Sequence, residues 1–149
     1  MKHIIQIHLE HKTDVLREIE ILTNNSLKDL HNMIKKTLKL EDNQMASFYK
    51  TNEEFELLKE IPLFKIDEKD IHMPDMSEMT ISSAFPKANS KLIYVYDFLK
   101  MWRFLATYSR NSMSKSKTNR IIKNIGDMPI DAPDVIFEAD SKFDEESDI

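Results

Sequence analysis

Asp97 and His31 are the two side chains of this 149-residue chain with the clearest potential for acid–base chemistry. Asp97 ends an apolar, aromatic run typical of a buried strand, where desolvation raises a carboxyl pKa. His31 lies in a helical stretch, and a carboxylate and an imidazole within reach form an acid–base pair. The less demanding roles are favoured. Asp97 is expected to cap a turn with its own side chain, and His31 to be a half-buried histidine at the rim of an apolar helix face, held by a hydrogen bond.

Three histidines near the N-terminus raise the possibility of a metal site. His3, His8 and His11 accompany Glu10, and imidazole and carboxylate groups are common zinc ligands. On a strand, however, His3 and His8 point to opposite faces because their positions differ by an odd number. A metal site built from this group is therefore disfavoured.

Methionines at three-residue spacing follow His72 and resemble thioether copper motifs. They are Met73, Met76 and Met79. Pro74 forces an extended backbone just before it, and methionines at this spacing usually fill a core. We expect core packing here, and no metal or cofactor in the chain.

The composition disfavours several classes of enzyme. The chain has no cysteine, which excludes thiolate zinc sites, iron–sulfur clusters and cysteine nucleophiles. Its single glycine, Gly126, is too few for phosphate-binding loops, dinucleotide fingerprints or a Gly-x-Ser-x-Gly elbow, because each needs glycine at several tight backbone positions. A catalytic centre is therefore the least favoured reading.

Charge is divided unevenly along the C-terminal part of the chain, although the net charge is -5. Residues 109–124 contain no acid and could contact phosphates, whereas the last residues are rich in Asp and Glu with Lys142 as their one base. Such an acidic tail competes electrostatically with nucleic acid for the basic segment, so nucleic-acid binding is an alternative and not the first choice. The basic side chains are Arg110, Lys115, Lys117, Arg120 and Lys123.

Two hairpins and one helix are the elements that must position these groups. Ser26, followed by Asp29, is a weak capping box that opens an amphipathic helix. Residues 92–96 are apolar without a break and predict a strand covered on both faces, while 102–108 alternate. Residues 97–101 predict a four- or five-residue loop built on a type I turn. Further strands are expected at 4–9, 16–22, 45–50 and 55–58, the helical stripe at Leu27, Leu30, Ile34 and Leu38, and a short helix near 77–84 within an irregular 61–85.

This order of elements predicts an α+β fold. We expect a β-grasp-like, mostly antiparallel sheet packed by one main helix, as a single domain over residues 1–133, followed by an acidic, mobile tail over 134–149. No apolar run approaches the roughly 18 residues of a spanning helix, and no signal peptide is evident. A cytoplasmic protein without membrane association is the expectation.

At the central hairpin the chain resembles the plasmid pRiA ORF-3-like family. Tyr94-Val95-Tyr96-Asp97-Phe98 with Trp102 is similar to the tyrosine-x-tyrosine-aspartate-phenylalanine, glycine-aspartate-glycine-tryptophan signature of that family, with Leu99-Lys100-Met101 in place of the glycine-aspartate-glycine. Further likenesses are Asp29-Leu30-His31 with Ile34, Glu41-Asp42 followed by Phe48, and the segment from Asn124 to Pro129. The resemblance implies the fold and an association with plasmids and mobile elements, and no activity defines the family.

The chain lacks cofactor-binding and nucleophile motifs, and it has an irregular segment and an acidic tail that can contact a partner. We expect a non-catalytic protein-interaction module, with the irregular 61–85 segment and the acidic tail as partner surfaces. Nucleic-acid binding through the basic segment is the alternative. An enzyme that uses Asp97 and His31 is the third hypothesis, and it requires one pocket lined by both.

Overall fold

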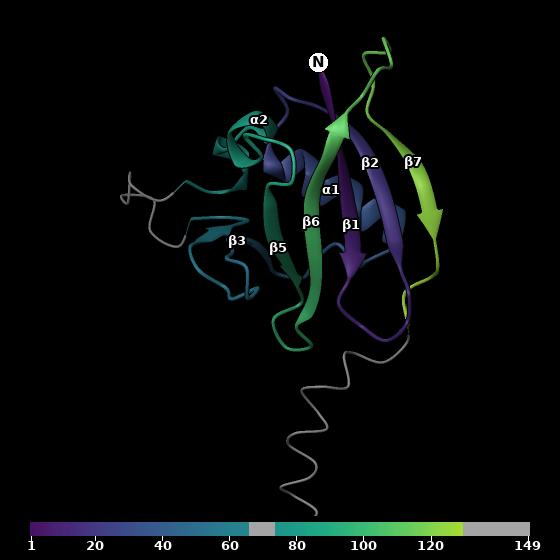
Figure 1. Ribbon diagram of the computed structural model, residues 1–149. Coiled ribbons are helices and arrows are strands. Elements are labelled where there is room, and N and C mark those ends of the chain that lie inside the picture. The colour runs from purple at the N-terminus through teal and green to yellow at the C-terminus, as the bar shows by residue number, and fades with distance from the viewer. Residues whose placement is uncertain (66–73, 130–149) are drawn as a thin grey trace, which may run out of the picture.

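The computed structural model describes residues 1–65 and 74–129, which form a sheet with one long helix across it (Figure 1). The strands are β1 (Lys2–Leu9), β2 (Leu16–Leu22), β3 (Ala46–Lys50), β4 (Glu60–Pro62), β5 (Lys91–Tyr96), β6 (Trp102–Asn111) and β7 (Arg120–Ile125). The helices are α1 (Leu27–Leu38), the 3₁₀ turn η1 (Met76–Glu78) and α2 (Ile81–Ala84). The sheet order is β4-β3-β5-β6-β1-β2-β7, and every neighbouring pair runs antiparallel.

The expected α+β class with a mostly antiparallel sheet is therefore confirmed, whereas the β-grasp likeness stays an expectation. The tail at 134–149 lies outside the described residues. Within the described ranges, no helix is long and apolar enough to cross a membrane.

Helix α1 forms where the sequence predicts it and buries the predicted stripe. The Ser26 hydroxyl accepts a hydrogen bond from Asp29 N–H and the Asp29 side chain bonds back to Ser26 N–H, so the capping box is complete. At its other end Lys39 adopts a left-handed conformation that closes the helix. The stripe packs into the core under the sheet through Leu27, Leu30, Ile34 and Leu38.

The middle of the sheet is the central hairpin, β5 and β6. All residues of β5 after Lys91 are buried, as the unbroken apolar run predicts, and β6 alternates between buried and half-buried positions. Tyr94 lies between Phe48 on β3 and Phe104 on β6 in the ladder, with ring centroids 4.9 and 5.9 Å away. Tilted rings at these distances attract one another beyond their burial alone, so this aromatic row ties three strands to α1.

For the outer strands, one sequence expectation was wrong and one strand was not predicted. The fourth strand is Glu60–Pro62 and not 55–58, because the chain from Thr51 to Lys59 closes a loop across the end of β3. The basic segment was not expected to hold a strand, yet it provides β7 at the free edge of the sheet. β7 pairs with β2, which lies far earlier in the chain, and local periodicity does not encode such a pairing. β4 is only three residues long, too short to show a periodic pattern.

The loop at 51–59 covers the outer side of β5, the face of the sheet opposite α1. Thr51 Oγ1 donates to Glu56 O at 2.8 Å, and Asn52 Oδ1 accepts from Glu54 N–H at 3.0 Å and from Glu56 N–H at 3.2 Å. These bonds organise the loop from within, and under it Ile93 is completely buried. The covering ends at β6, where Leu105 on the same face is half-buried.

The turn between β5 and β6 is closed by Asp97 in the way the sequence favours. Its Oδ1 accepts from the N–H groups of Leu99 at 3.1 Å and Lys100 at 3.3 Å, and Met101 N–H donates to Asp97 O at 2.6 Å. Asp97 and Met101 both have positive φ, 63° and 55°. Aspartate tolerates this region, but methionine is strained there, and the resembled signature has its second glycine at this position.

We therefore expect Met101→Gly to stabilise the protein by about 1 kcal/mol, because glycine adopts positive φ without a steric penalty. For a domain of this size, the melting temperature rises by about 2–4 °C. The measurement is calorimetric melting of wild type and variant. Leu99→Gly is the control: Leu99 is 94% exposed and its φ is not positive, so glycine there lowers the melting temperature. A Met101→Gly protein that melts at or below wild type contradicts the strain at this turn.

Candidate functional site

Asp97 and His31 lie in different surroundings. Asp97, with Tyr96 and Trp102 of the hairpin, lines a pocket of about 330 Å³ beside the C-terminal end of α1, and His31 is not part of that pocket. His31 instead bonds to Tyr94, with 2.7 Å between Nδ1 and the phenol oxygen. The geometry thus keeps the proposed acid–base partners apart.

His31 is more buried than the sequence indicates. It is 2% exposed and sits under the sheet instead of at the rim of the helix, because Tyr94 offers its hydroxyl inside the core. Burial, assisted by the charges of Lys35 and Lys28, lowers the pKa of His31 to about 4, and burial raises that of Tyr94. At neutral pH both partners are uncharged and share one buried hydrogen bond, which is a structural arrangement.

The other histidines and methionines do not gather into a metal site. His3 stacks on Tyr108 with 3.7 Å between ring centroids, while His8 lies exposed on the opposite face and pairs with Asp14. Within the described residues, no group of three or more His, Cys, Asp or Glu side chains is arranged to hold a metal. Met76 is buried in the core and Met79 packs against it. His72 and Met73 lie outside the described residues.

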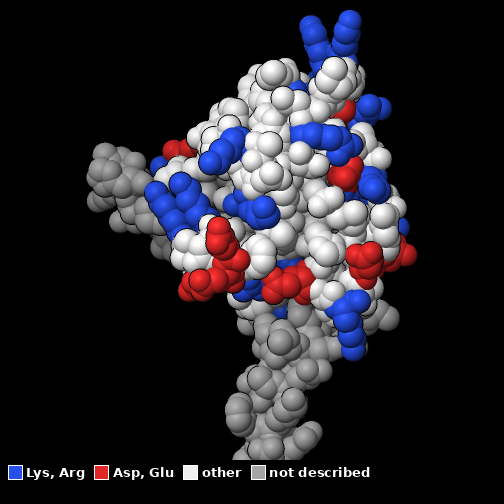
Figure 2. Space-filling model, viewed as in Figure 1, with Lys and Arg blue, Asp and Glu red and all other residues white. Residues whose placement is uncertain are grey.

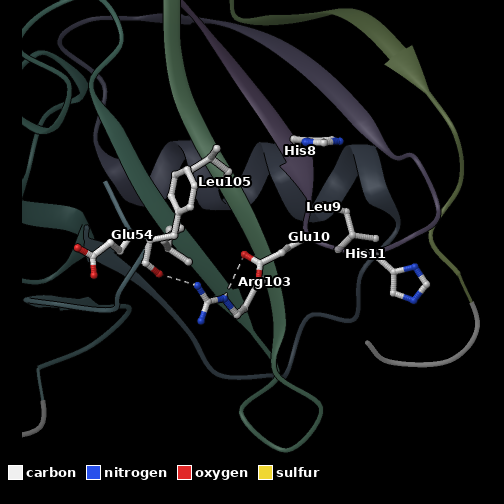
Figure 3. A pocket seen from close by; sticks show the side chains of 9 residues that line it. His8, Leu9, Glu10, His11, Glu54, Arg103 and Leu105 are labelled. Atoms are coloured by element: carbon white, nitrogen blue, oxygen red, sulfur yellow. Dashed lines mark hydrogen bonds and ion pairs between the residues drawn. The ribbon is translucent and has the colours of Figure 1, made fainter. Parts of the chain in front are cut away.

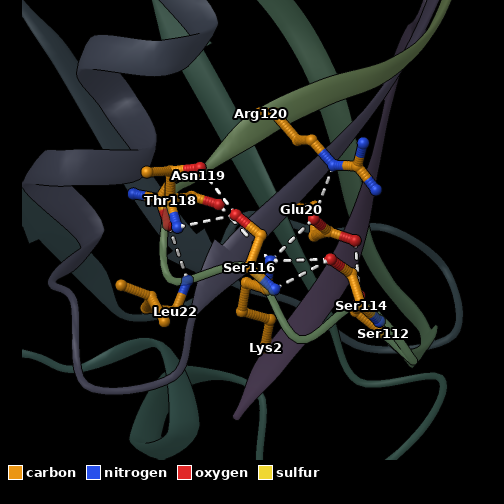
Figure 4. A network of polar contacts seen from close by, with 9 residues as sticks. All are labelled: Lys2, Glu20, Leu22, Ser112, Ser114, Ser116, Thr118, Asn119 and Arg120. Carbon is orange, nitrogen blue, oxygen red and sulfur yellow. Dashed lines mark hydrogen bonds and ion pairs between the residues drawn. The ribbon is translucent and has the colours of Figure 1, made fainter.

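Two of the five basic side chains, Arg110 and Arg120, form ion pairs with glutamates of the sheet. Arg120 Nε donates to Glu20 at 2.8 Å, and Arg110 pairs with Glu18 at 3.4 Å. Glu20 also accepts hydrogen bonds from Lys2 Nζ at 2.9 Å and from the Ser112 hydroxyl. These bonds hold the connection between β6 and β7 against β1 and β2 (Figure 4). Burial alone would raise the pKa of Glu20, but these donors hold it at about 2.

The remaining lysines stay available to solvent. Lys115, Lys117 and Lys123 are exposed and make no ion pair with the described residues. Figure 2 shows basic groups projecting at the end of the molecule where β6 and β7 are joined, and acidic groups across the lower part of the same face. The basic segment therefore offers two exposed lysines in the β6–β7 connection and one on β7, while its two arginines are paired with glutamates.

A groove on the outer face of the sheet brings together side chains that sequence reasoning did not connect (Figure 3). Its floor is a row across three strands, because Leu105 on β6 pairs with Ile93 of β5 on one side and with His8 of β1 on the other. Its volume is about 610 Å³. We call it the Phe55 groove, and its lining is His8, Leu9, Glu10, His11, Glu54, Phe55, Ile93, Arg103 and Leu105.

Phe55 forms one wall of this groove in an unusual conformation. Its φ is +60°, a region that large side chains rarely occupy, and the residue is 42% exposed. The Phe55 N–H donates to Asn52 O at 3.1 Å, and its carbonyl accepts from Arg103 at 2.9 Å. The surrounding bonds thus hold an aromatic ring in solvent at the cost of backbone strain, a combination that clusters at functional sites.

Arg103 connects the two sides of the groove. While one end of its guanidinium group binds the Phe55 carbonyl, its Nε lies 3.4 Å from Glu10 Oε2, within ion-pair range but without the alignment of a hydrogen bond. The sequence places Arg103 and Leu105 on the outer face of β6 by alternation. It gives no signal for Phe55, because a positive φ in a loop leaves no periodic trace.

Comparison with known proteins supports this fold. A family model described as plasmid pRiA4b ORF-3-like protein matches residues 2–134. A crystal structure of a protein of unknown function from Methanosarcina mazei Go1 aligns with a TM-score of 0.69 and 16% sequence identity, over 97% of this chain and 81% of that one. Identity this low shows a shared fold alone. No curated protein matches the chain.

Burial of neutral His31 predicts that the protein loses stability in mild acid. The unfolded chain takes up a proton near pH 6.5, whereas the folded chain does so only near pH 4, so the free energy of unfolding falls as pH drops below 6.5. The loss from this group is about 1.4 kcal/mol per pH unit, or about 2 kcal/mol at pH 5. Urea melts at pH 7, 6 and 5 measure it.

His31→Asn, which retains a polar partner for Tyr94, is expected to show a shallower pH dependence over this range. His8→Asn is the comparison variant: His8 is exposed and pairs with Asp14 at the surface, so its removal is not expected to make the pH dependence shallower. The neutral, buried state of His31 is refuted if His31→Asn and wild type lose stability in parallel between pH 7 and pH 5.

Proposed function

The chain belongs to the plasmid pRiA4b ORF-3-like family, and we propose that it is a non-catalytic protein-interaction module that docks a partner on the Phe55 groove. The observation that carries the proposal is Phe55 itself, a partly exposed phenylalanine with a positive φ beside an apolar floor. Aromatic side chains in pockets supply much of the energy of protein interfaces. Backbone strain such as that at Phe55 is concentrated at functional sites, where the strained position serves binding or catalysis.

A non-catalytic role is supported by the places of the acid–base candidates. The Asp97 carboxylate is engaged by the N–H groups of its own turn. His31 is enclosed in the core and uncharged at neutral pH. A general base needs to reach the proton that it removes, and neither group is arranged to do so together with the other.

We expect a photo-crosslinking amino acid at position 55 to form a protein adduct in cells of the native host. Phe64 is the matched control, because it is also an exposed phenylalanine, at 57%, but does not line the groove. Leu105→Glu places a charge on the apolar floor and is expected to abolish the adduct at position 55 with the melting temperature retained. The same adduct at both positions, or none at position 55, contradicts docking on the groove.

Nucleic-acid binding is the second candidate, favoured by the three lysines that make no ion pair with the described residues. If Lys115, Lys117 and Lys123 contact phosphates of a single strand, a fourfold rise in salt lowers the affinity about twentyfold. Gel shifts with single-stranded DNA at 50 and 200 mM salt test this, with Lys115→Gln/Lys117→Gln as the variant. Lys50→Gln, an exposed lysine at the far end of the sheet, is the control. No retardation at 50 mM salt removes this candidate.

A further inference from the structure

We infer that the partner segment that occupies the Phe55 groove is cationic and apolar, with lysine or arginine side chains alternating with aliphatic ones. This inference rests on the proposed docking function and names the chemistry of the occupant. It follows from the charges at the rim of the groove and the apolar strip on its floor.

The charges of the lining leave an excess of carboxylate. Glu10 and Glu54 both line the groove, while Arg103 is its one permanently cationic residue and is already paired with Glu10. The Glu54 side chain is exposed and makes no ion pair or hydrogen bond with the described residues. One uncompensated negative charge therefore stands at the rim beside Phe55.

More acidic groups stand just outside the lining. Glu53 and Glu56 belong to the same exposed loop as Phe55, and Asp14 is 3.1 Å from His8 at the opposite rim. Figure 2 shows acidic groups across the lower part of this face, with basic groups beside and below them. A cationic segment is attracted and oriented by such a field, whereas an acidic one is repelled.

The floor requires an apolar component between those charges. Leu105 is half-buried, Ile93 lies at the base, and the Phe55 ring rises beside them. An extended segment presents alternate side chains to opposite sides, so apolar residues enter the groove while the long cationic ones reach the carboxylates at its rim. In this arrangement Phe55 contributes most of the binding energy, and the glutamates select a cationic partner.

Fluorescence polarisation with two labelled nonapeptides tests the inference. One probe alternates leucine with lysine, and the other alternates leucine with glutamate. We expect the lysine probe to bind at least tenfold more tightly, and a rise from 50 to 200 mM NaCl to weaken it several-fold. Phe55→Gly, which keeps the backbone conformation but removes the ring, is expected to weaken it more than fivefold.

Paired variants separate the groove from general attraction to an acidic protein. Glu54→Gln is expected to weaken the lysine probe two- to fivefold and Glu54→Lys to reverse the preference, because rim charges contribute modestly and additively. Glu41→Gln, an exposed carboxylate beside the Asp97 pocket, and Phe64→Gly leave binding unchanged.

The outcomes distinguish this inference from the proposed function. Equal or tighter binding of the glutamate probe, or lysine-probe binding that is insensitive to Phe55→Gly and Glu54→Lys, overturns the cationic occupant. A position-55 adduct that persists in that case leaves the docking function standing. If neither probe binds and no adduct forms at position 55, both fall.

Discussion

The aromatic row that ties the sheet to its helix is the interaction on which the rest of the structure depends. Tyr94 packs against Phe48 and Phe104 from the two neighbouring strands and bonds to His31 of α1. Removing the ring would open a cavity, and removing only its hydroxyl would leave a buried imidazole nitrogen without a partner. Tyr94 therefore both fills the core and provides the hydrogen-bond partner that allows His31 to be buried.

Because His31 and the face of the sheet that packs on α1 are buried, we expect binding groups on the opposite face. Among the described elements, the long helix covers one face, so binding groups on the opposite face stay free of packing demands. The outer face is not uniformly exposed, because the 51–59 loop shields β5 and the β6–β7 connection shields the Lys2–Glu20 pair. The Phe55 groove lies where the first of these coverings ends.

The sequence predicted the elements with a clear local pattern and missed those that are very short or depend on distant partners. The capping box, the helical stripe and the two main hairpins each follow from spacing within a few residues, and the structure confirms them. β7 joins the sheet by pairing with β2, far earlier in the chain, and its residues are mostly exposed, so no buried periodicity marks that strand. β4 pairs with its neighbour β3, but its three residues are too few to show a period. The depth of His31 was missed because the tyrosine that satisfies it is 63 residues away.

The groove was harder to foresee for a further physical reason. Its floor is a row of single residues from three strands, so it exists only once the register is fixed; a shift by one residue on β6 would replace Leu105 with the inward-facing Phe104 or Ala106. Its wall is a phenylalanine in a conformation that intrinsic preference opposes. Local preference is overruled at this position by Arg103 and the Asn52 bonds, and departures of this kind from local consistency are expected at functional sites. Met101 has a similar positive φ but lines neither this groove nor the Asp97 pocket, so its strain shapes no binding surface, whereas the strain at Phe55 accompanies a residue of the groove wall.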